Sequence, residues 1–351
     1  MDNSTINIFE LNKIIQEIEL KRQRREKIYG KVPPLIFTKD GNYKLIAMGN
    51  TIIRSDRWKT FPDFLYEYLW HILGSDWYKN ESQKPYEDQS EILKWYYKTE
   101  EFSSKQIPND DGIISVNPNG MMAAYTLLAY DLYAVLRSNF KIDSLVERLK
   151  DKNQFQGARY ELFCLAACIR GGYEIILENE KDPSKKHVEF IIHDKENNIE
   201  LSVEAKSKHR SGVLGYPGDK IEDDKIRLGN ITSLINNAIS KDSSKPLVVF
   251  IEFNLPPQYA EYVIGGKSMK KVIDIFNNVK KTNDNKDFFN LAILTNHPHH
   301  YGKDDSADPE KMYSLVYSLN PAHPIRNKNT FDKLVYATLL YGNIPKYFED
   351  L

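Results

Sequence analysis

Residues 187–206 read HVEFIIHDKENNIELSVEAK, and their alternation of apolar and polar side chains predicts two β-strands joined by a tight turn. One face of each strand is apolar and is expected to point into a core: Val188, Phe190 and Ile192, then Ile199, Leu201, Val203 and Ala205. With Glu196 and Asn197 as the turn, Glu189 lies directly opposite Glu204. With the turn one residue later, the two carboxylates are diagonal neighbours on the same face. Either register predicts a shared patch of two carboxylates and Lys206.

Two adjacent carboxylates repel each other by about 1 kcal/mol or more unless a cation neutralises them. Mg²⁺ prefers oxygen ligands and also binds substrate phosphates, so this patch would suit metal-assisted hydrolysis of a phosphodiester. Lys206 follows Glu204 on the same face, where its ammonium could contact an attacking water or a phosphate. An exposed sheet face with ordinary salt bridges is the alternative interpretation, because E-x-K is a common tripeptide.

The chain has 351 residues, 41% of them hydrophobic, which is enough for two domains or one large one. Its formal net charge is −1, so a polyanion would have to be bound by a local basic patch or a metal. The two cysteines, Cys164 and Cys168, are one helical turn apart on an apolar stretch, which indicates buried thiols. With no signal peptide or spanning segment recognised, a cytoplasmic protein that does not enter a membrane is expected.

Residues 1–150 are expected to form a mostly helical domain without a recognisable chemical motif. Residues 7–29 predict a helix with a basic end, and 35–49 predict two short strands. Further helices are predicted around 56–97, which holds all four tryptophans, and within 121–150. A recognition or regulatory role is expected for this domain, toward a protein partner, a DNA structure or a signal, or in a homo-oligomer, and which of these applies stays open.

Residues 151–351 have a different pattern, with predicted elements in the order α-β-β-β-α-β before a C-terminal extension. Residues 152–171 predict a helix with an apolar stripe, and 174–180 predict a strand that precedes the hairpin. Residues 226–239 have apolar side chains at helical intervals, and 246–255 form an unbroken apolar strand. Such a strand is typical of a sheet buried on both faces and reached by a crossover helix.

This order of elements resembles the core of the PD-(D/E)XK nuclease superfamily, the restriction-endonuclease-like fold, over about residues 152–255. The matching motifs are the opening helix with GARYE, the hairpin, the E-x-K at residues 204–206 and the crossover helix. The resemblance implies a mixed α/β (α+β) fold: a mostly helical N-terminal region, then a mixed sheet flanked by helices.

The resemblance also implies the site. Glu189 and Glu204 would bind Mg²⁺, for which Mn²⁺ can substitute, together with the backbone carbonyl of Ala205. Lys206 would activate or orient the water, and Glu161 on the opening helix would complete the site. Glu189 stands where the family has Asp and has a longer side chain, and Val188 stands where the family has the preceding proline; these are departures from the family pattern.

Asp182 is the alternative to Glu189 as the metal ligand. It lies next to a proline, Pro183, and the corresponding acid of the family also has a proline beside it. It lies before the hairpin strand, and its parity puts it on the wrong face, so Glu189 is preferred. Contacts with the phosphates of a nucleic acid are expected from basic residues beside the site: Lys208, His209, Arg210 and Arg159. For Arg159 a salt bridge is the alternative.

The extension contains a predicted strand at 288–295 that ends in Asn296-His297-Pro298-His299-His300. Closely spaced histidines suggest zinc, but neighbouring residues rarely bind one ion well, so the role of this run stays open. The sequence as a whole predicts a Mg²⁺-dependent endonuclease, with DNA as the expected substrate and defence against foreign DNA as its expected role. A nuclease-like module that has lost catalysis and binds nucleic acid or assembles with partners is the alternative.

Overall fold

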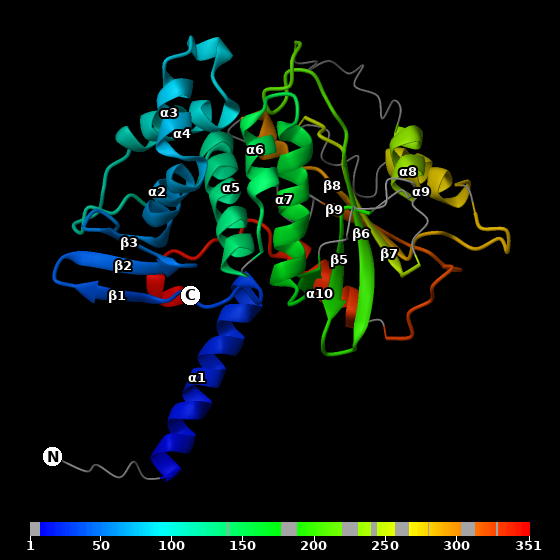
Figure 1. Cartoon of the computed structure of the whole chain (residues 1–351), viewed down its shortest axis with the longest axis horizontal. Coiled ribbons are helices and arrows are strands. Elements are labelled where there is room, and N and C mark those ends of the chain that lie inside the picture. Colours follow the sequence, from blue (N-terminus) through cyan, green and yellow to red (C-terminus); the bar gives the residue numbers. More distant parts are fainter. Residues whose placement is uncertain are drawn as a thin grey trace.

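A computed structural model describes residues 8–138, 140–176, 188–219, 231–239, 244–256, 267–279, 281–302, 313–327 and 329–351. Its centre is a mixed six-stranded sheet in the order β4-β5-β6-β7-β8-β9 (Figure 1). The strands are β4 Glu174–Ile176, β5 Phe190–Asp194, β6 Ile199–Ser207, β7 Leu247–Glu252, β8 Leu291–Thr295 and β9 Tyr313–Tyr317. Strands β6, β7 and β8 run parallel, and the remaining neighbours are antiparallel. The fold is therefore of the mixed α/β class that the sequence predicts.

The hairpin β5–β6 has the register predicted for a turn at Glu196 and Asn197. Phe190 pairs with Val203, and the ladder closes at Asp194 and Ile199. Beyond the end of this ladder, the N–H of Glu189 still donates to the carbonyl of Val203 (3.1 Å), so Glu189 stays beside β6. The period of the sequence thus fixed which side chains of the two strands are neighbours.

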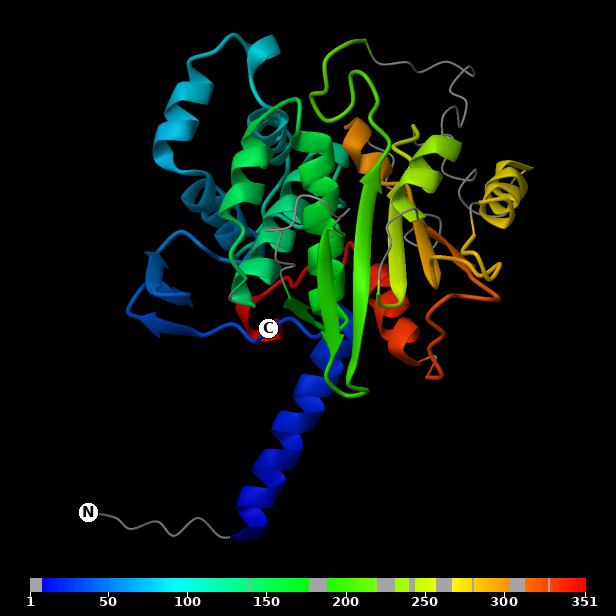
Figure 2. The same ribbon diagram turned by 45° about the vertical axis from the view of Figure 1, so that its right-hand side comes forward.

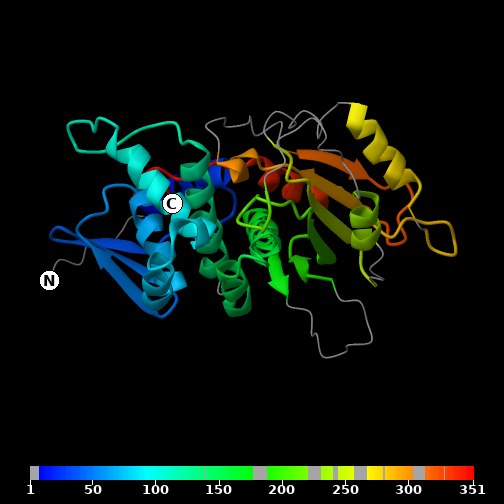
Figure 3. The ribbon, with the colours of Figure 1, turned by 90° about the horizontal axis from the view of Figure 1, so that it is seen from above.

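Helices cover both faces of the sheet, as Figures 2 and 3 show. On one face α7 (Phe155–Arg170) and α10 (Asn329–Leu339) pack over Phe190, Leu201 and Val203. On the other, α8 (Ile231–Ile239) and α9 (Lys267–Asn277) form a second apolar cluster. Val188 packs in this second cluster, so the prediction that it shares the face of Phe190 is wrong. The regular strand begins only at Phe190, and the alternation does not extend back to Val188.

The crossover predicted between the E-x-K strand and the apolar strand is present. Strand β7 lies parallel to β6, pairs Ser207 with Glu252, and is followed in the sheet by β8. Helix α8 lies between β6 and β7 in the chain. Since parallel strands end at the same edge, the last residues of β6, β7 and β8 come together there.

The N-terminal part combines helices with a three-stranded antiparallel sheet. Its strands are β1 Phe37–Asp40, β2 Tyr43–Met48 and β3 Thr51–Ser55; the sequence predicted the first two and missed β3. Its helices are α1 Ile8–Tyr29, α2 Phe61–Leu73, α3 Ser75–Ser82, α4 Glu91–Ser104, α5 Gly120–Arg137 and α6 Asp143–Lys150. Helix α1 projects from the body of the molecule (Figure 1). No helix among the described residues combines the length and apolar character needed to cross a bilayer.

One apolar cluster joins the two halves of the chain across the boundary predicted near residue 150. It includes Phe61 and Phe64 of α2, Leu128 of α5, Phe163 of α7 and Phe250 of β7. The C-terminal residues return to it, where Phe348 contacts the rings of Phe37, Trp58 and Phe61. The N-terminal region and the sheet therefore share a hydrophobic core.

Asp194 anchors the hairpin turn from the end of β5. It is fully buried, and its carboxylate accepts hydrogen bonds from Lys333 Nζ (2.6 Å), from Asn197 Nδ2 (2.6 Å) and from the N–H of Glu196 (3.2 Å). Burial disfavours the charged carboxylate, but the bonds from Lys333 and Asn197 outweigh it and lower the pKa of Asp194 below its ordinary value.

We expect Asp194→Asn to lower the free energy of unfolding at pH 7 by about 1.5–3 kcal/mol, the usual contribution of a hydrogen bond to a charged group. The folded-state pKa is depressed, so this stabilisation exists above the unfolded pKa of about 3.9 and is lost as the pH falls through the folded value. Urea unfolding at pH 7 and pH 3 checks the expectation. The variant should be less stable at pH 7 and the difference should be smaller at pH 3, and Asp110→Asn in an exposed loop is the control.

Candidate active site

The hairpin brings Glu189, Glu204 and Lys206 together beside the carboxyl end of β6. Lys206 Nζ lies 2.6 Å from Glu204 Oε1 and 3.1 Å from Glu189 Oε1. The Lys206 ammonium therefore bridges carboxylates from two neighbouring strands. This is the convergence that the E-x-K motif and the hairpin register predict.

The three side chains differ in exposure. The Glu204 side chain is fully buried, whereas those of Glu189 and Lys206 are 30% and 28% exposed. Burial lowers the pKa of Lys206, but the charge and hydrogen bond of Glu204, and then Glu189, outweigh it, so that pKa is raised above its ordinary value. Lys206 is thus a fixed cation at neutral pH, and the site opens to solvent beside it and Glu189.

Glu161 of α7 adds a third carboxylate to this group. Its side chain is 18% exposed and pairs with Arg148 of α6, whose Nη1 lies 2.6 Å from Glu161 Oε2. Burial raises the pKa of Glu161, Arg148 lowers it, and the charge of Glu189 raises it further, with a net increase. The charge of Glu161 therefore interacts with that of Glu189, while its ion pair is with Arg148, and its role in completing the site stays a prediction.

Ala205 lies in β6 between Glu204 and Lys206, and its small side chain packs into the core beneath α7. Because successive side chains of a strand point to opposite faces, Glu204 and Lys206 lie on the face opposite to Ala205. The pattern of E-x-K along one strand thus has a direct structural cause: the middle residue anchors the strand while its neighbours project together.

The basic residues after the motif form a loop held against the end of the sheet. The Lys208 N–H donates to the Glu252 carbonyl (2.8 Å), and Arg210 Nε donates to the Phe253 carbonyl (3.0 Å). Buried Gln156 of α7 accepts from the Arg210 N–H (3.1 Å) and donates to its carbonyl (2.7 Å). Lys208 is partly exposed, while the guanidinium of Arg210 is partly engaged by the backbone, and contacts of either residue with a phosphate stay predictions.

His209 is exposed in the same loop, with its ring 5.2 Å from that of Tyr216. Partial burial of the His209 ring disfavours its charged form, and the charge of Lys208 adds to this effect, so the pKa of His209 is lowered. A neutral imidazole can donate one hydrogen bond and accept another, and the contact of His209 with a phosphate stays a prediction.

Arg159 is not placed to contact a nucleic acid, and the salt-bridge alternative is the correct one. Its side chain is 1% exposed. Nη1 pairs with Asp131 Oδ2 of α5 at 2.8 Å, and Nη2 donates to the Tyr341 hydroxyl at 2.8 Å. Arg159 follows the helical stripe that faces α5, so its charge is satisfied inside the shared core.

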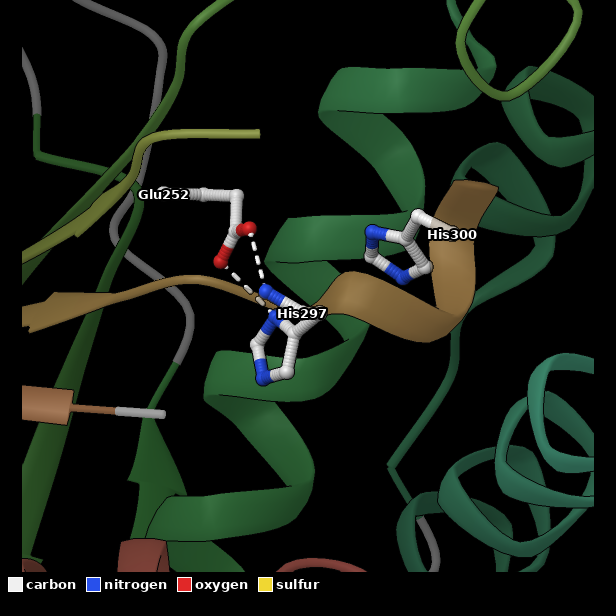
Figure 4. Close-up of side chains that lie close together, drawn as sticks. All are labelled: Glu252, His297 and His300. Atoms are coloured by element: carbon white, nitrogen blue, oxygen red, sulfur yellow. Dashed lines mark hydrogen bonds and ion pairs between the residues drawn. The ribbon is translucent and has the colours of Figure 1, made fainter. Parts of the chain in front are cut away.

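The structure also gathers Glu252, His297 and His300, a group that the sequence did not predict as a unit (Figure 4). The sequence did contain a signal: Glu252 ends one parallel strand, and the histidines directly follow the next. Pairing β7 with β8 in parallel brings these ends to one edge of the sheet. Asp182 lies outside the described residues, and its alternative role stays a prediction.

A cleft of about 1030 Å³ lies elsewhere, between the N-terminal helices and the C-terminal segment. Tyr66, Trp70 and Tyr96 are among its lining residues, and neither Glu204 nor Lys206 is. Two of its cations are engaged within the chain: Arg57 pairs with Glu67, and Lys59 donates to two loop carbonyls. The carboxylate–lysine group is therefore separate from this cleft.

Comparison with known proteins adds no relative, since no family model, no curated protein and no solved structure matches this chain. The site geometry and the sequence resemblance alone therefore bear on function.

Proposed function

We propose that this protein is a metal-dependent nuclease that hydrolyses phosphodiester bonds in DNA. The observation that supports it most is the contact of Lys206 Nζ with both Glu204 and Glu189 at the end of β6. These are the positions at which the PD-(D/E)XK resemblance implies the two acids and the lysine. The proposal extends to a cytoplasmic role in defence against foreign DNA, and that extension rests on the resemblance alone.

The donor set fits a hard divalent ion. Glu161, Glu189 and Glu204 offer carboxylate oxygens only, and the Ala205 carbonyl would add a neutral one. Lys206 and Arg148 supply two positive charges against three negative ones, so the group keeps one excess negative charge. When bound, Mg²⁺ would polarise a phosphate oxygen and favour ionisation of a water.

The side chains of the chain have distinct tasks in this proposal. Lys206, fixed between two carboxylates, would donate a hydrogen bond to the attacking water or to a phosphate oxygen and stabilise charge that develops there. Buried Glu204 would hold the Lys206 ammonium in place. Lys208 and His209, at the mouth of the loop, would bind the neighbouring phosphates and position the strand.

A cleavage assay tests the proposal. Plasmid, linear duplex, single-stranded DNA and RNA are incubated with the protein and Mg²⁺, Mn²⁺ or EDTA. We expect metal-dependent cutting of DNA that Glu204→Gln abolishes, because the neutral amide loses the charge that holds Lys206 and a metal ligand. Glu200→Gln is the matched control, since Glu200 lies in the same strand with a half-exposed side chain paired to Lys245.

If no substrate is cut in any metal, but nucleic acid binds wild type and Glu204→Gln equally, the nuclease proposal is wrong. That outcome would favour a binding module that uses the same fold without catalysis.

A further inference from the structure

Three metal-ligating side chains meet at the carboxyl edge of the sheet, on the side covered by α7. Glu252 is the last residue of β7, while His297 caps and His300 lies within the 3₁₀-helix Pro298–Tyr301 that follows β8. One ligand atom from each lies within 4.8 Å of the others (Figure 4). All three residues are at most 5% exposed.

The carboxylate of Glu252 is held in one orientation. Oε1 accepts the backbone N–H of His297 (2.9 Å), and Oε2 lies 2.7 Å from His297 Nδ1. The Thr295 hydroxyl also donates to Oε2 (2.5 Å) and is itself linked to the Tyr160 hydroxyl of α7 (2.8 Å). Outer partners of this kind orient the ligands of a metal ion in advance of binding.

His300 gives the second, independent indication of a ligand. It is 95% buried, and its Nε2 has no hydrogen-bond partner among the described residues. Its Nδ1 lies 3.5 Å from Asn254 Oδ1, a long contact. The Asn254 amide nitrogen donates to Ser207 Oγ and to the Lys208 carbonyl (2.9 Å each), which turns Oδ1 toward His300. A buried imidazole with an unsatisfied nitrogen is costly unless something binds it.

We propose that Glu252, His297 and His300 bind one divalent transition-metal ion of the zinc type. Two imidazoles and one carboxylate form a donor set that suits Zn²⁺, whose bonds to nitrogen and oxygen are about 2.0–2.2 Å long. Ligand atoms that surround such an ion lie about 3–3.5 Å apart. At present Glu252 Oε2 lies 2.7 Å from His297 Nδ1 and the ligand atoms lie at most 4.8 Å apart, so binding would require the side chains to adjust.

This ion would be separate from the Mg²⁺ of the proposed nuclease. The nuclease group is carboxylate-only and opens to solvent, whereas this group is rich in nitrogen and closed, so the two sites favour different metals. A closed zinc site stabilises the fold, and here it would fix the residues after β8 to the end of β7. The inference does not depend on the proposed function.

Metal content tests this proposal. Protein purified without chelators is passed through a desalting column, and its metals are measured by inductively coupled plasma mass spectrometry. We expect about one zinc-type ion per chain in wild type, because a closed structural site retains its metal. His300→Gln and Glu252→Gln should lose it, weakening binding by more than the ~10–100-fold typical of changes to an outer partner. His299→Gln is the control, since His299 is equally buried in the same run but outside the group.

Two further measurements test the metal site even if a variant fails to fold. Wild type stripped with a strong chelator should unfold at a lower temperature and recover on addition of Zn²⁺ but not Mg²⁺. Glu204→Gln should retain the bound metal, which separates this site from the proposed nuclease site. Wild type that holds no transition metal and shows no shift in unfolding temperature with Zn²⁺, Mn²⁺, Co²⁺ or Fe²⁺ overturns the inference, whatever its nuclease activity.

Discussion

Lys206→Met should lower the rate of DNA cleavage by about 100- to 1000-fold, the usual effect of removing one group that stabilises charge in a transition state. The ammonium of Lys206 bridges Glu204 and Glu189, so its position is fixed before a substrate arrives. Methionine retains most of the length and apolar volume of lysine but neither its charge nor its hydrogen bonds. Single-turnover cleavage at saturating protein measures this loss in the chemical step.

Lys208→Met is the matched control, because Lys208 lies two residues further along, is also partly buried and contacts neither carboxylate in any ion pair described. It should weaken DNA binding and its salt dependence while leaving the rate at saturation nearly unchanged, as expected for a phosphate contact. An equal fall in the rate at saturation for both variants would contradict the assigned role of Lys206. So would full activity of Lys206→Met.

The same substitution has a second expected result that does not require turnover. Without Lys206, Glu204 and Glu189 lose the cation between them, so Mg²⁺ should raise the unfolding temperature of Lys206→Met more than that of wild type. The same rise in unfolding temperature is measured for both proteins with Ca²⁺. This ion also binds carboxylates but prefers a different coordination geometry from Mg²⁺. No metal dependence in either protein would argue against a metal at these carboxylates.

The hairpin could be predicted because its information is local. The period of two predicts the faces of the strands, and both turn positions that bury the apolar residues put Glu189 and Glu204 on one face; the ladder has the register of the turn at Glu196 and Asn197. The parallel partner of the E-x-K strand was also predictable, since an unbroken apolar strand after a helix needs a buried place in a sheet. Both predictions depend on which residues avoid water.

The rest depended on long-range contacts that no local pattern contains. Arg159 is spaced like a solvent-facing arginine beside Glu161, but its partner is Asp131, 28 residues earlier on α5. Glu252 and His300 likewise meet only because β7 and β8 are adjacent. Strand β3 was missed because its sequence, TIIRS, is short and half exposed, and its hairpin partner alone defines it.

Asp131→Ala should be the most destabilising single substitution we predict, lowering the free energy of unfolding by about 3–5 kcal/mol. Asp131 is fully buried in α5 and accepts both Arg159 (2.8 Å) and Arg170 (2.6 Å) from α7. Arginine cannot lose its proton in a protein, so removal of the carboxylate leaves two buried positive charges without their anion. Urea unfolding monitored by tryptophan fluorescence measures the change.

Glu147→Ala is the matched control for this prediction, because Glu147 also pairs with a cation on its helix but its side chain is 71% exposed. Exposed pairs are screened by water, so its unfolding midpoint should remain close to that of wild type. The comparison separates the burial of a charge from the mere presence of an ion pair.

Replacing all three residues by apolar ones, Asp131→Leu with Arg159→Met and Arg170→Met, should recover much of the lost stability, since no buried charge then remains. If Asp131→Ala unfolds at the midpoint of wild type, the network does not hold α5 against α7. The shared core of the N-terminal helices and the sheet would then rest on apolar packing alone.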